Sequence, residues 1–337
     1  MPKEAKFTPP LLDIFKAKTG SDDPATYFNM EMREVYFKPP RETADFSKYY
    51  DEVPPMPNNP GWEIGEWGVG QIPGSEYHFI HIVHPMTKLR SVKELEEYPF
   101  PDIMADYRHA HLDAEVERYK NQGLAVIGYM EWTIFEIAWH MRGMDRLFED
   151  IAFNPDFATV LLEKITEIRC QMARRYAESG VDIIRVGDDI GTQRGMLMSP
   201  KMWREWFKPR LLRVIESAKK VNPRVFISYH SDGYIEPVIP DLIEIGVNIL
   251  NPIQPECMSI ANLKRRYGRD LSFWGGIGTQ TTMPFGTPDE VRFKVREAIE
   301  ILGAGGGYVI APTHVLEPDV PWENILAFFE AVEGTKL

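Results

Sequence analysis

Three side chains in the second half of the chain have the types and spacing of a metal site. The stretch "YHSDG" holds His230 and Asp232 two residues apart, so in an extended chain both point to one side. His314 follows a later apolar run, "GYVIAPTH". Zn²⁺ accepts imidazole and carboxylate ligands and can keep a position open for substrate. These residues predict a divalent metal site, with the alternative that Asp232 only orients His230 or holds the turn at Gly233.

Acidic side chains end two other apolar runs and are candidates for proton transfer. Glu131 closes "AVIGYME", and Asp188 and Asp189 close "IIRVGDD". Crowded carboxylates disfavour joint ionisation, so one of them can hold a proton near neutral pH. We expect Glu131, Asp188 and Asp189 to be catalytic. The alternative is that Asp188 or Asp189 caps the loop that follows.

Further polar and aromatic residues follow the same apolar runs. Four of them are predicted to contact a small-molecule substrate: Trp132, Gln193, Gln254 and Gln280. Cys257 is a further ligand candidate, although a lone cysteine more commonly packs as a small apolar side chain.

The elements that must position these residues alternate regularly from about residue 124. Apolar strands are expected at 125–130, 182–187, 224–230, 247–251, 271–276 and 307–312. Each is followed by a segment with helical spacing, expected at about 155–179, 200–220, 235–245, 259–268, 288–302 and 321–332. Such alternation is typical of parallel βα units.

These six units, with two less legible ones nearer the N-terminus, predict a (β/α)₈ TIM barrel. A doubly wound sheet is the alternative, but no Gly-rich dinucleotide fingerprint follows the early strands. Barrel active sites lie at the carboxyl ends of the strands, where the candidate residues stand. Residues 1–110 are rich in Pro and aromatics and are expected to form an irregular extension, with a strand at 77–83, packed on the main body at 111–337.

Composition excludes several classes of function. The chain has 337 residues, 44% of them hydrophobic, and a net charge of −12, which argues against binding to nucleic acid or an anionic membrane. The sequence has no apolar run of about 18 residues, so no membrane span is predicted. The first residues lack the apolar core of a secretory signal, and only Cys170 and Cys257 are present. A cytoplasmic enzyme is therefore expected. The sequence leaves open whether the protein forms a homodimer.

Several motifs in register resemble the uroporphyrinogen decarboxylase superfamily over about residues 125–335. They are "MRGMDRLFEDIAFNPDFATVLLEKITE", "RVGDDIGTQRGMLMSPKMWREWFKPRLLRVIESAK", "ISYHSDGYIEPVIPDLIEIGVNILN", "SFWGGIGTQ" and "GYVIAPTHVLEPDVPWENILAFFEAV". The resemblance implies a (β/α)₈ barrel and one of two chemistries. One branch decarboxylates a porphyrinogen without metal, using a basic N-terminal Arg-Gln-Ala-Gly-Arg-like motif. Here "NMEMREVYF" offers only Arg33 in that role.

The other branch transfers methyl groups between corrinoid proteins and other substrates. It binds zinc through a His-x-Cys motif and a Cys in an "APGC"-like context. His230 matches directly, while Asp232 and His314 stand where that branch has cysteines. Such replacement implies a harder divalent site, Zn²⁺ or another cation, suited to polarising an ether or phenolic oxygen.

The function expected is a metal-assisted methyltransferase of the O-demethylation type. It moves a methyl group from a small methoxylated or methylated substrate to a corrinoid. The chain has no Asp-x-His-x-x-Gly corrinoid motif, so a partner protein must supply that cofactor. One alternative is a metal-free carboxy-lyase acting on a tetrapyrrole or other carboxylated substrate. Another is a non-catalytic binding barrel, which the density of ionisable strand ends disfavours.

Overall fold

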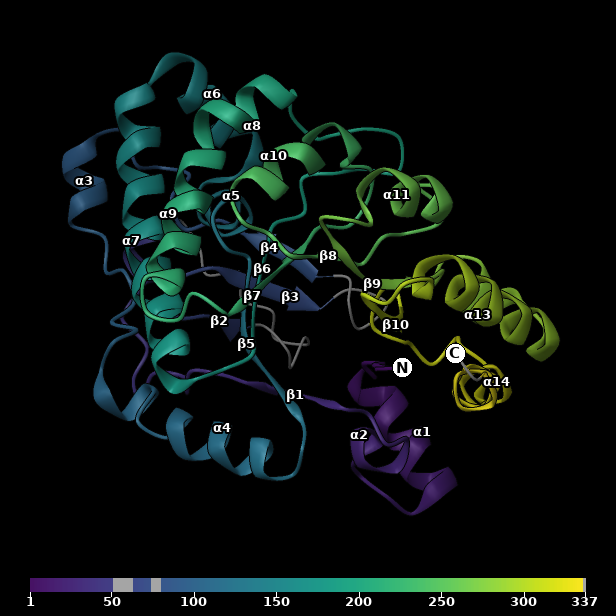
Figure 1. Cartoon of the computed structure of the whole chain (residues 1–337). Coiled ribbons are helices and arrows are strands. Elements are labelled where there is room, and N and C mark those ends of the chain that lie inside the picture. Colours follow the sequence, from purple (N-terminus) through teal and green to yellow (C-terminus); the bar gives the residue numbers. More distant parts are fainter. Residues whose placement is uncertain (51–62, 74–79, 336–337) are drawn as a thin grey trace.

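A curled sheet of seven parallel strands forms the centre of the protein in the computed structural model, which describes residues 1–50, 63–73 and 80–335 (Figure 1). The strand order is β1-β5-β6-β7-β8-β9-β10. This sheet, with helices outside it, confirms the predicted α/β barrel architecture. The strands are β1 (Met32–Val35), β5 (Ala125–Glu131), β6 (Ile183–Gly187), β7 (Phe226–His230), β8 (Ile249–Asn251), β9 (Ser272–Ile277) and β10 (Tyr308–Pro312).

The first residues of the chain lie in the gap between β10 and β1. Lys3 and Phe7 each form an isolated parallel bridge on the β10 side, with Ile310 and Leu316 respectively. On the β1 side, side chains make contacts with this segment: Lys6 Nζ lies 2.7 Å from Glu34 Oε1. Residues 2–8 thus occupy the eighth position of the barrel, one of the two units that the sequence left less legible.

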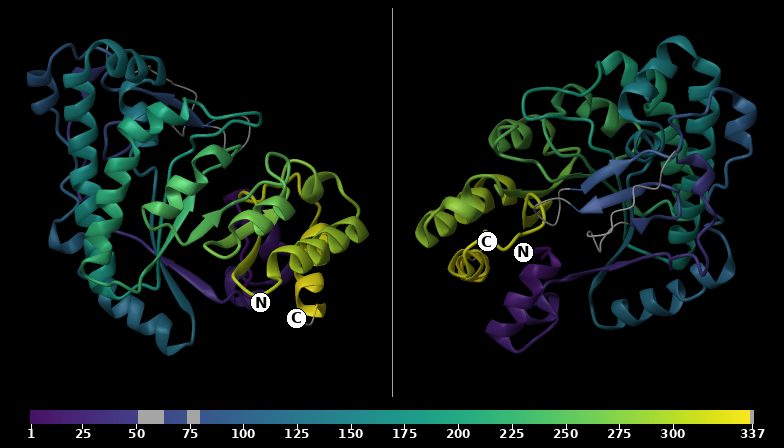
Figure 2. Two further views of the ribbon diagram at one scale, coloured as in Figure 1. Left: turned by 45° about the horizontal axis from the view of Figure 1, so that its top comes forward. Right: turned by 180° about the vertical axis from the view of Figure 1, so that it is seen from behind.

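The helices cover the outside of the sheet, as Figures 1 and 2 show. The predicted helix at 155–179 is confirmed, with Leu161 and Ile165 fully buried on its inner face. The α-helices are α1 (Pro9–Thr19), α2 (Pro24–Tyr27), α3 (Val92–Glu96), α4 (Leu112–Asn121), α5 (Phe135–Arg142), α6 (Met144–Phe153), α7 (Pro155–Ser179), α8 (Pro200–Trp206), α9 (Lys208–Lys219), α10 (Ile239–Glu244), α11 (Ile260–Tyr267), α12 (Thr282–Phe285), α13 (Pro288–Gly303) and α14 (Trp322–Gly334). Short 3₁₀ turns are η1 (Ser47–Tyr49), η2 (Asp106–Arg108) and η3 (Glu236–Val238).

One expected helix is wrong in its extent. The sequence predicted a single helix from Pro200 to about residue 220, but the structure has α8 and α9 there, with a break at Phe207. Pro209 causes the break, because proline has no N–H to donate and its ring clashes with the carbonyl four residues earlier. In α9 it occupies the first turn, where both defects are tolerated.

The region before residue 110 contributes both to the barrel and to structures outside it. Strands β2 (Glu63–Ile64), β3 (Gly70–Pro73) and β4 (Ile80–Val83) form a separate antiparallel sheet. The strand expected at 77–83 is confirmed over 80–83, and its first residues lie outside the described part of the chain. Helices α1 and α2 lie beside α14 (Figure 2). The ring of Phe28, at the end of α2, is stacked on that of Phe329 of α14, with the ring centroids 3.7 Å apart. Strand β1 precedes residue 110 but belongs to the barrel sheet. The division at residue 110 into an extension and a main body stays a prediction.

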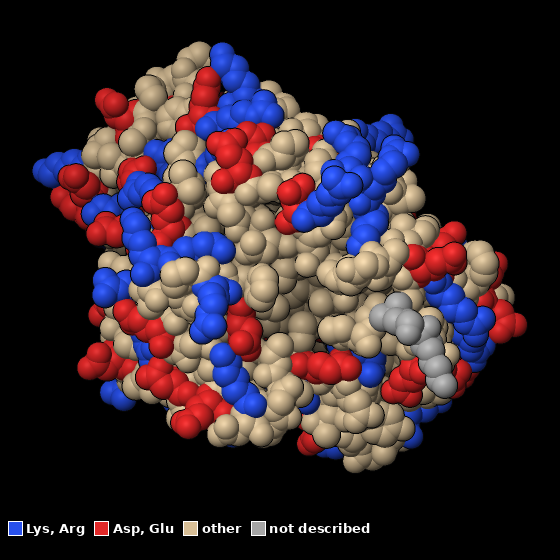
Figure 3. All heavy atoms as spheres, viewed as in Figure 1, with Lys and Arg blue, Asp and Glu red and all other residues tan. Residues whose placement is uncertain are grey.

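The surface carries charges of both signs. On the face in Figure 3, Lys and Arg side chains alternate with Asp and Glu around a central hollow of uncharged residues. None of the helices in the described part of the chain is long and apolar enough to cross a membrane.

Candidate functional site

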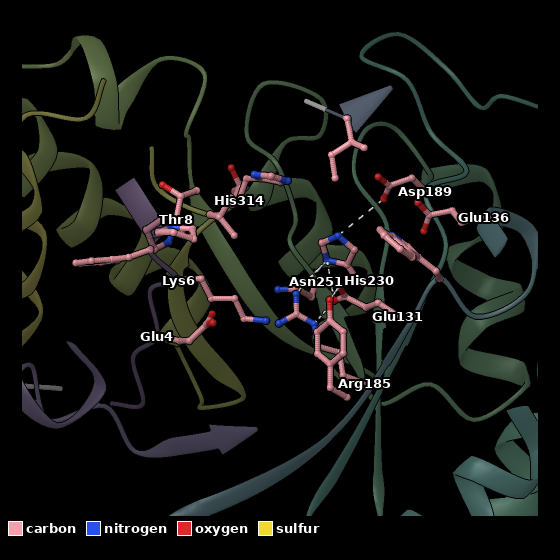
Figure 4. A pocket seen from close by; sticks show the side chains of 18 residues that line it. Glu4, Lys6, Thr8, Glu131, Glu136, Arg185, Asp189, His230, Asn251 and His314 are labelled. Atoms are coloured by element: carbon pink, nitrogen blue, oxygen red, sulfur yellow. Dashed lines mark hydrogen bonds and ion pairs between the residues drawn. The ribbon is translucent and has the colours of Figure 1, made fainter. Parts of the chain in front are cut away.

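A cavity of about 430 Å³ lies inside the barrel toward the carboxyl ends of its strands (Figure 4). Its lining includes residues from β5, β6, β7, β8 and β10 and from the N-terminal segment. Five of the residues predicted from the sequence line it: Glu131, Trp132, Asp189, His230 and His314. The barrel therefore brings together strand ends that are far apart in the sequence.

Within this region, three side chains form a group that could hold a metal ion. One ligand atom each from Asp189, His230 and Asp232 lies within 4.8 Å of the other two. The Nε2 atom of His230 is 3.8 Å from Asp189 Oδ1 and 4.0 Å from Asp232 Oδ1. His314, expected as the third ligand, lies beside this group, with its Nε2 atom 4.0 Å from Asp232 Oδ2.

Electrostatics in this group favour a bound cation. Burial and repulsion from Asp189 raise the pKa of Asp232 to about 7. The Oδ1 atom of Asp232 is buried and has no hydrogen-bond partner among the described residues. An unpaired buried oxygen is costly, and a cation held between the two carboxylates would relieve both the repulsion and the missing contact. The donor set of nitrogen and oxygen fits Zn²⁺ and harder divalent ions.

Charged side chains below the metal group fill the barrel interior. Arg185 on β6 is buried, and its Nε atom pairs with Glu131 Oε1. Burial opposes ionisation of Glu131, but His230 and Arg185 outweigh it and hold its pKa at about 2. The hydroxyl of Tyr129 also donates to Glu131. Glu131 is thus ionised at neutral pH and committed as a counter-ion, which favours a charge-balancing role over proton donation.

Asp188 is buried behind the cavity wall and caps a helix. Its carboxylate accepts the backbone N–H groups of Ile134 and Glu136, each at 3.0 Å, at the start of α5. Burial raises its pKa to about 6, although these backbone donors oppose the rise. The alternative considered for Asp188 was a cap on the loop that follows it, whereas these contacts are made to α5, which precedes it in the chain. Asp188 is not among the described residues that line the cavity.

The three glutamines expected to contact substrate are not among the described residues at the cavity wall. Gln254 accepts the backbone N–H of Gly233 at 2.5 Å and so supports the turn after His230. Gln193 accepts the thiol of Cys257 at 2.9 Å, and Gln280 lies exposed in the turn after β9. Burial raises the pKa of the Cys257 thiol, which disfavours a thiolate ligand.

Trp132 does line the cavity, in an unusual backbone conformation. It has a positive φ of 55° and a partly exposed indole. Its carbonyl oxygen accepts Arg169 Nη2 at 2.8 Å. A non-glycine residue in this region is strained and persists where its surroundings hold it, and such strain is concentrated at functional sites.

Several residues that line the cavity were not predicted from the sequence. Arg185 has a visible signal, because a charge in the middle of the apolar run "DIIRVG" is unusual. Glu4 and Lys6 alternate in "MPKEAKF", the pattern of a strand with one polar face. Glu136 on α5 has no such signal, since a glutamate in the first turn of a helix is ordinary. Burial and the nearby Asp189 raise its pKa well above its ordinary value.

Comparison with known proteins assigns this fold and cavity to a family. The profile described as "Uroporphyrinogen decarboxylase (URO-D)" matches residues 71–335. The chain belongs to the uroporphyrinogen decarboxylase family. Members of this family are enzymes, decarboxylases or methyltransferases, so the resemblance found in the sequence is confirmed.

Relatives with both activities are similar to this chain at low identity. It is 22% identical to "Uroporphyrinogen decarboxylase 2, chloroplastic" of Oryza sativa subsp. japonica over 76% of its own length, but spans 64% of that protein. It is 27% identical to "Methylcobamide:CoM methyltransferase MtaA" of Methanosarcina barkeri over 51% of its length, and spans 49% of that protein. The chain thus spans less than two thirds of either relative.

A solved structure shares the fold. A "methyltransferase from Methanosarcina mazei" superposes with a TM-score of 0.64 at 20% identity, covering 92% of this chain and 82% of the other. At that identity the likeness speaks for the fold alone.

Proposed function

We propose that this protein is a methyltransferase of the family that moves a methyl group from a small methoxylated or methylated substrate to the corrinoid of a partner protein. A divalent cation, Zn²⁺ by preference, assists the reaction. The observation that supports this most strongly is the group formed by Asp189, His230 and Asp232, in which the buried Oδ1 atom of Asp232 has no hydrogen-bond partner among the described residues. The relationship to a methylcobamide:CoM methyltransferase supports a corrinoid as one partner of the transfer, although in that relative the methylcobamide gives the methyl group and here it would receive it.

In this proposal the metal is held by Asp189, His230 and Asp232, and His314 stands next to Asp232 as a further donor. When bound, the cation supplies Lewis acidity to the oxygen that carries the methyl group. The harder donor set, with oxygen atoms in place of thiolates, suits an ether oxygen better than activation of a thiol.

The transfer breaks the bond between the methyl carbon and its oxygen and forms a bond from that carbon to cobalt(I). Cobalt supplies the new electron pair, and the oxygen leaves with the old one and then needs a proton. Of the acids expected from the sequence, Glu131 is paired with Arg185 and Asp188 caps α5. Glu136 lines the cavity near Asp189 and is the carboxyl group best placed to give that proton (Figure 4).

Methyl transfer to free cob(I)alamin tests the proposal directly. Zn²⁺-loaded protein is mixed with a panel of methoxylated compounds, and formation of methylcobalamin is followed by absorbance. We expect turnover with at least one compound and a loss of about 10²-fold or more in His230→Ala, as for loss of a group acting on the transition state. His81→Ala, which removes an exposed histidine of β4, is the matched control. Equal turnover by metal-free protein would contradict the metal-assisted mechanism.

A carboxy-lyase acting on a tetrapyrrole or other carboxylated substrate is the second candidate. Lys6 and Arg185 line the cavity and could attract carboxylates. However, Lys6 is paired with Glu34 and Arg185 with Glu131, so neither cation is uncompensated. Decarboxylation of uroporphyrinogen by metal-free protein would establish this alternative in place of methyl transfer.

A further inference from the structure

The second ring nitrogen of His230 has a defined partner in the barrel interior. Its Nδ1 atom lies 2.6 Å from the side-chain oxygen Oδ1 of Asn251. The two residues are direct partners in the parallel pairing of β7 and β8, so the contact follows from the strand register. Asn251 is buried, and its side chain reaches the imidazole from the adjacent strand (Figure 4).

Other contacts decide which end of the Asn251 amide faces the ring. Its Nδ2 group donates to the backbone oxygen of Trp274 at 3.3 Å. Its Oδ1 atom accepts Nη2 of Arg185 at 3.0 Å, and a guanidinium can only donate. The oxygen of the amide therefore points toward His230. Nη2 of Arg185 also lies 3.2 Å from Nδ1, but the contact with the amide oxygen is shorter, at 2.6 Å, and is favourable only if Nδ1 carries the proton. In the neutral ring Nε2 then keeps its lone pair.

The orientation of that lone pair matches the metal group. Nε2 is the atom that lies 3.8 Å from Asp189 and 4.0 Å from Asp232. We propose that Asn251, held by Arg185 and Trp274, is a positioning residue that fixes the Nδ1–H form of His230 and so aims Nε2 at the metal. The part of this inference that concerns metal rests on the proposed function, but the state of the ring does not.

Glu131 is the competing acceptor for the same proton. Its Oε1 atom is 3.7 Å from His230 Nδ1, which is beyond hydrogen-bond distance, and it is already paired with Arg185. Arg185 thus serves both residues: it neutralises Glu131 and donates to Asn251. This arrangement assigns the orienting contact to the amide and leaves the carboxylate as counter-ion.

The state of the ring can be measured without any metal. ¹⁵N chemical shifts of His230 in metal-free protein, at a pH where the ring is neutral, report which nitrogen carries the proton. We expect the Nδ1–H form in wild type and in Glu131→Gln, and loss of that preference in Asn251→Leu. If Asn251→Leu kept the Nδ1–H form while Glu131→Gln lost it, Glu131 would be the orienting residue and the proposal would be overturned.

Metal affinity, measured by competition with a chromophoric chelator, gives an independent readout. Removal of an orienting partner typically lowers metal affinity about 10- to 100-fold, and we expect such a loss of Zn²⁺ affinity in Asn251→Leu. Asn251→Asp keeps an acceptor for Nδ1–H but loses the donor to the Trp274 carbonyl and adds a charge, so we expect it to bind Zn²⁺ more tightly than Asn251→Leu. Thermal unfolding of both variants separates loss of the orienting contact from a folding defect. Asn262→Leu, at an exposed position on α11, is the control.

Two outcomes separate this inference from the function it refines. If wild type bound no metal, the proposed function would fail, while the ring measurement would still decide the role of Asn251. If wild type bound metal and Asn251→Leu bound it equally well with the ring unchanged, the role of Asn251 would be overturned and the metal centre would stand.

Discussion

The Nε2 atom of His230 lies 3.8 Å from Oδ1 of Asp189, although the two residues come from different strands of the barrel. The register of β6 and β7 explains this, because Gly187 is the direct partner of His230. Asp189 and Asp232 each follow that pair by two residues, and the backbone N–H of Asp232 donates to Asp189 at 2.7 Å. Two neighbouring strand ends therefore build the metal group together.

Gly187→Ala should disturb this pairing. A Cβ atom at Gly187 would meet the carbonyl oxygen of His230 and, at 2.6 Å, its Cβ atom, so the strands must shift. We expect a loss of about 1–3 kcal/mol in the free energy of unfolding, as for other overpacked sites, and weaker Zn²⁺ binding. Both are measured by denaturant titration and chelator competition. Gly195→Ala, where a Cβ meets nothing within 4 Å, is the control, and equal behaviour of the two variants would contradict this account of the register.

Asp188→Asn should destabilise the protein more than it impairs metal binding. The substitution replaces one acceptor oxygen by an NH₂ group that faces the N–H donors of Ile134 and Glu136. Leaving buried donors unpaired costs about 1–3 kcal/mol in the free energy of unfolding. The matched control, Asp289→Asn on the exposed face of α13, should change it by less than about 0.5 kcal/mol. If Asp188→Asn lost methyl-transfer activity while its free energy of unfolding stayed unchanged, Asp188 would instead take part in the reaction directly.

Arg185→Met should be strongly destabilising, because it leaves Glu131 buried without its guanidinium partner. Breaking a buried ion pair on one side costs about 3–5 kcal/mol. The double variant Arg185→Met/Glu131→Gln removes the uncompensated charge and should recover part of that loss. Urea unfolding of the two variants is the measurement. If the double variant were no more stable than Arg185→Met, neutralisation of buried Glu131 would not be the role of Arg185.

Because His140 is buried with a lowered pKa, we expect the protein to lose stability in acid. Burial and the neighbouring His84 lower its pKa to about 3, from an ordinary value of 6.5. The unfolded chain therefore binds a proton between these values that the folded chain does not, so stability falls as the pH falls below about 6.5. The contribution reaches at most about 1.4 kcal/mol per pH unit.

His140→Gln removes this titration. The difference in unfolding free energy between wild type and variant should move in favour of the variant from pH 7 to pH 4. A difference that stays constant over this range would show that the ring is not buried in its neutral form.

Much of the barrel was predictable, because each strand from β5 to β10 is a short apolar run followed by a helix. The position of Asp189 in the metal group was harder to predict, since strand register decides whether Asp189 or His314 meets His230. Asp188 and Asp189 are adjacent in the sequence, yet one caps α5 and the other faces the cavity. Only their opposite orientations at the end of β6 separate these roles.

The interior charges were the least predictable part of the site. Lys6 and Glu4 reach the cavity because the start of the chain fills the eighth barrel position, and nothing local in "MPKEAKF" specifies that pairing. Asn251 stood at a predicted strand end, but its contact with His230 depends on the register of β7 and β8. Long-range pairing, rather than local propensity, decides both placements.

Zn²⁺ binding to the purified protein tests the central claim most directly. Equilibrium titration of metal-free wild type against a chromophoric chelator should give one tight site per chain. Affinity should fall steeply in Asp189→Ala, His230→Ala and Asp232→Ala, fall less in His314→Ala, and stay unchanged in His81→Ala. Absence of a site in wild type, or affinity that none of the three ligand variants lowers, would contradict the metal centre and with it the proposed mechanism.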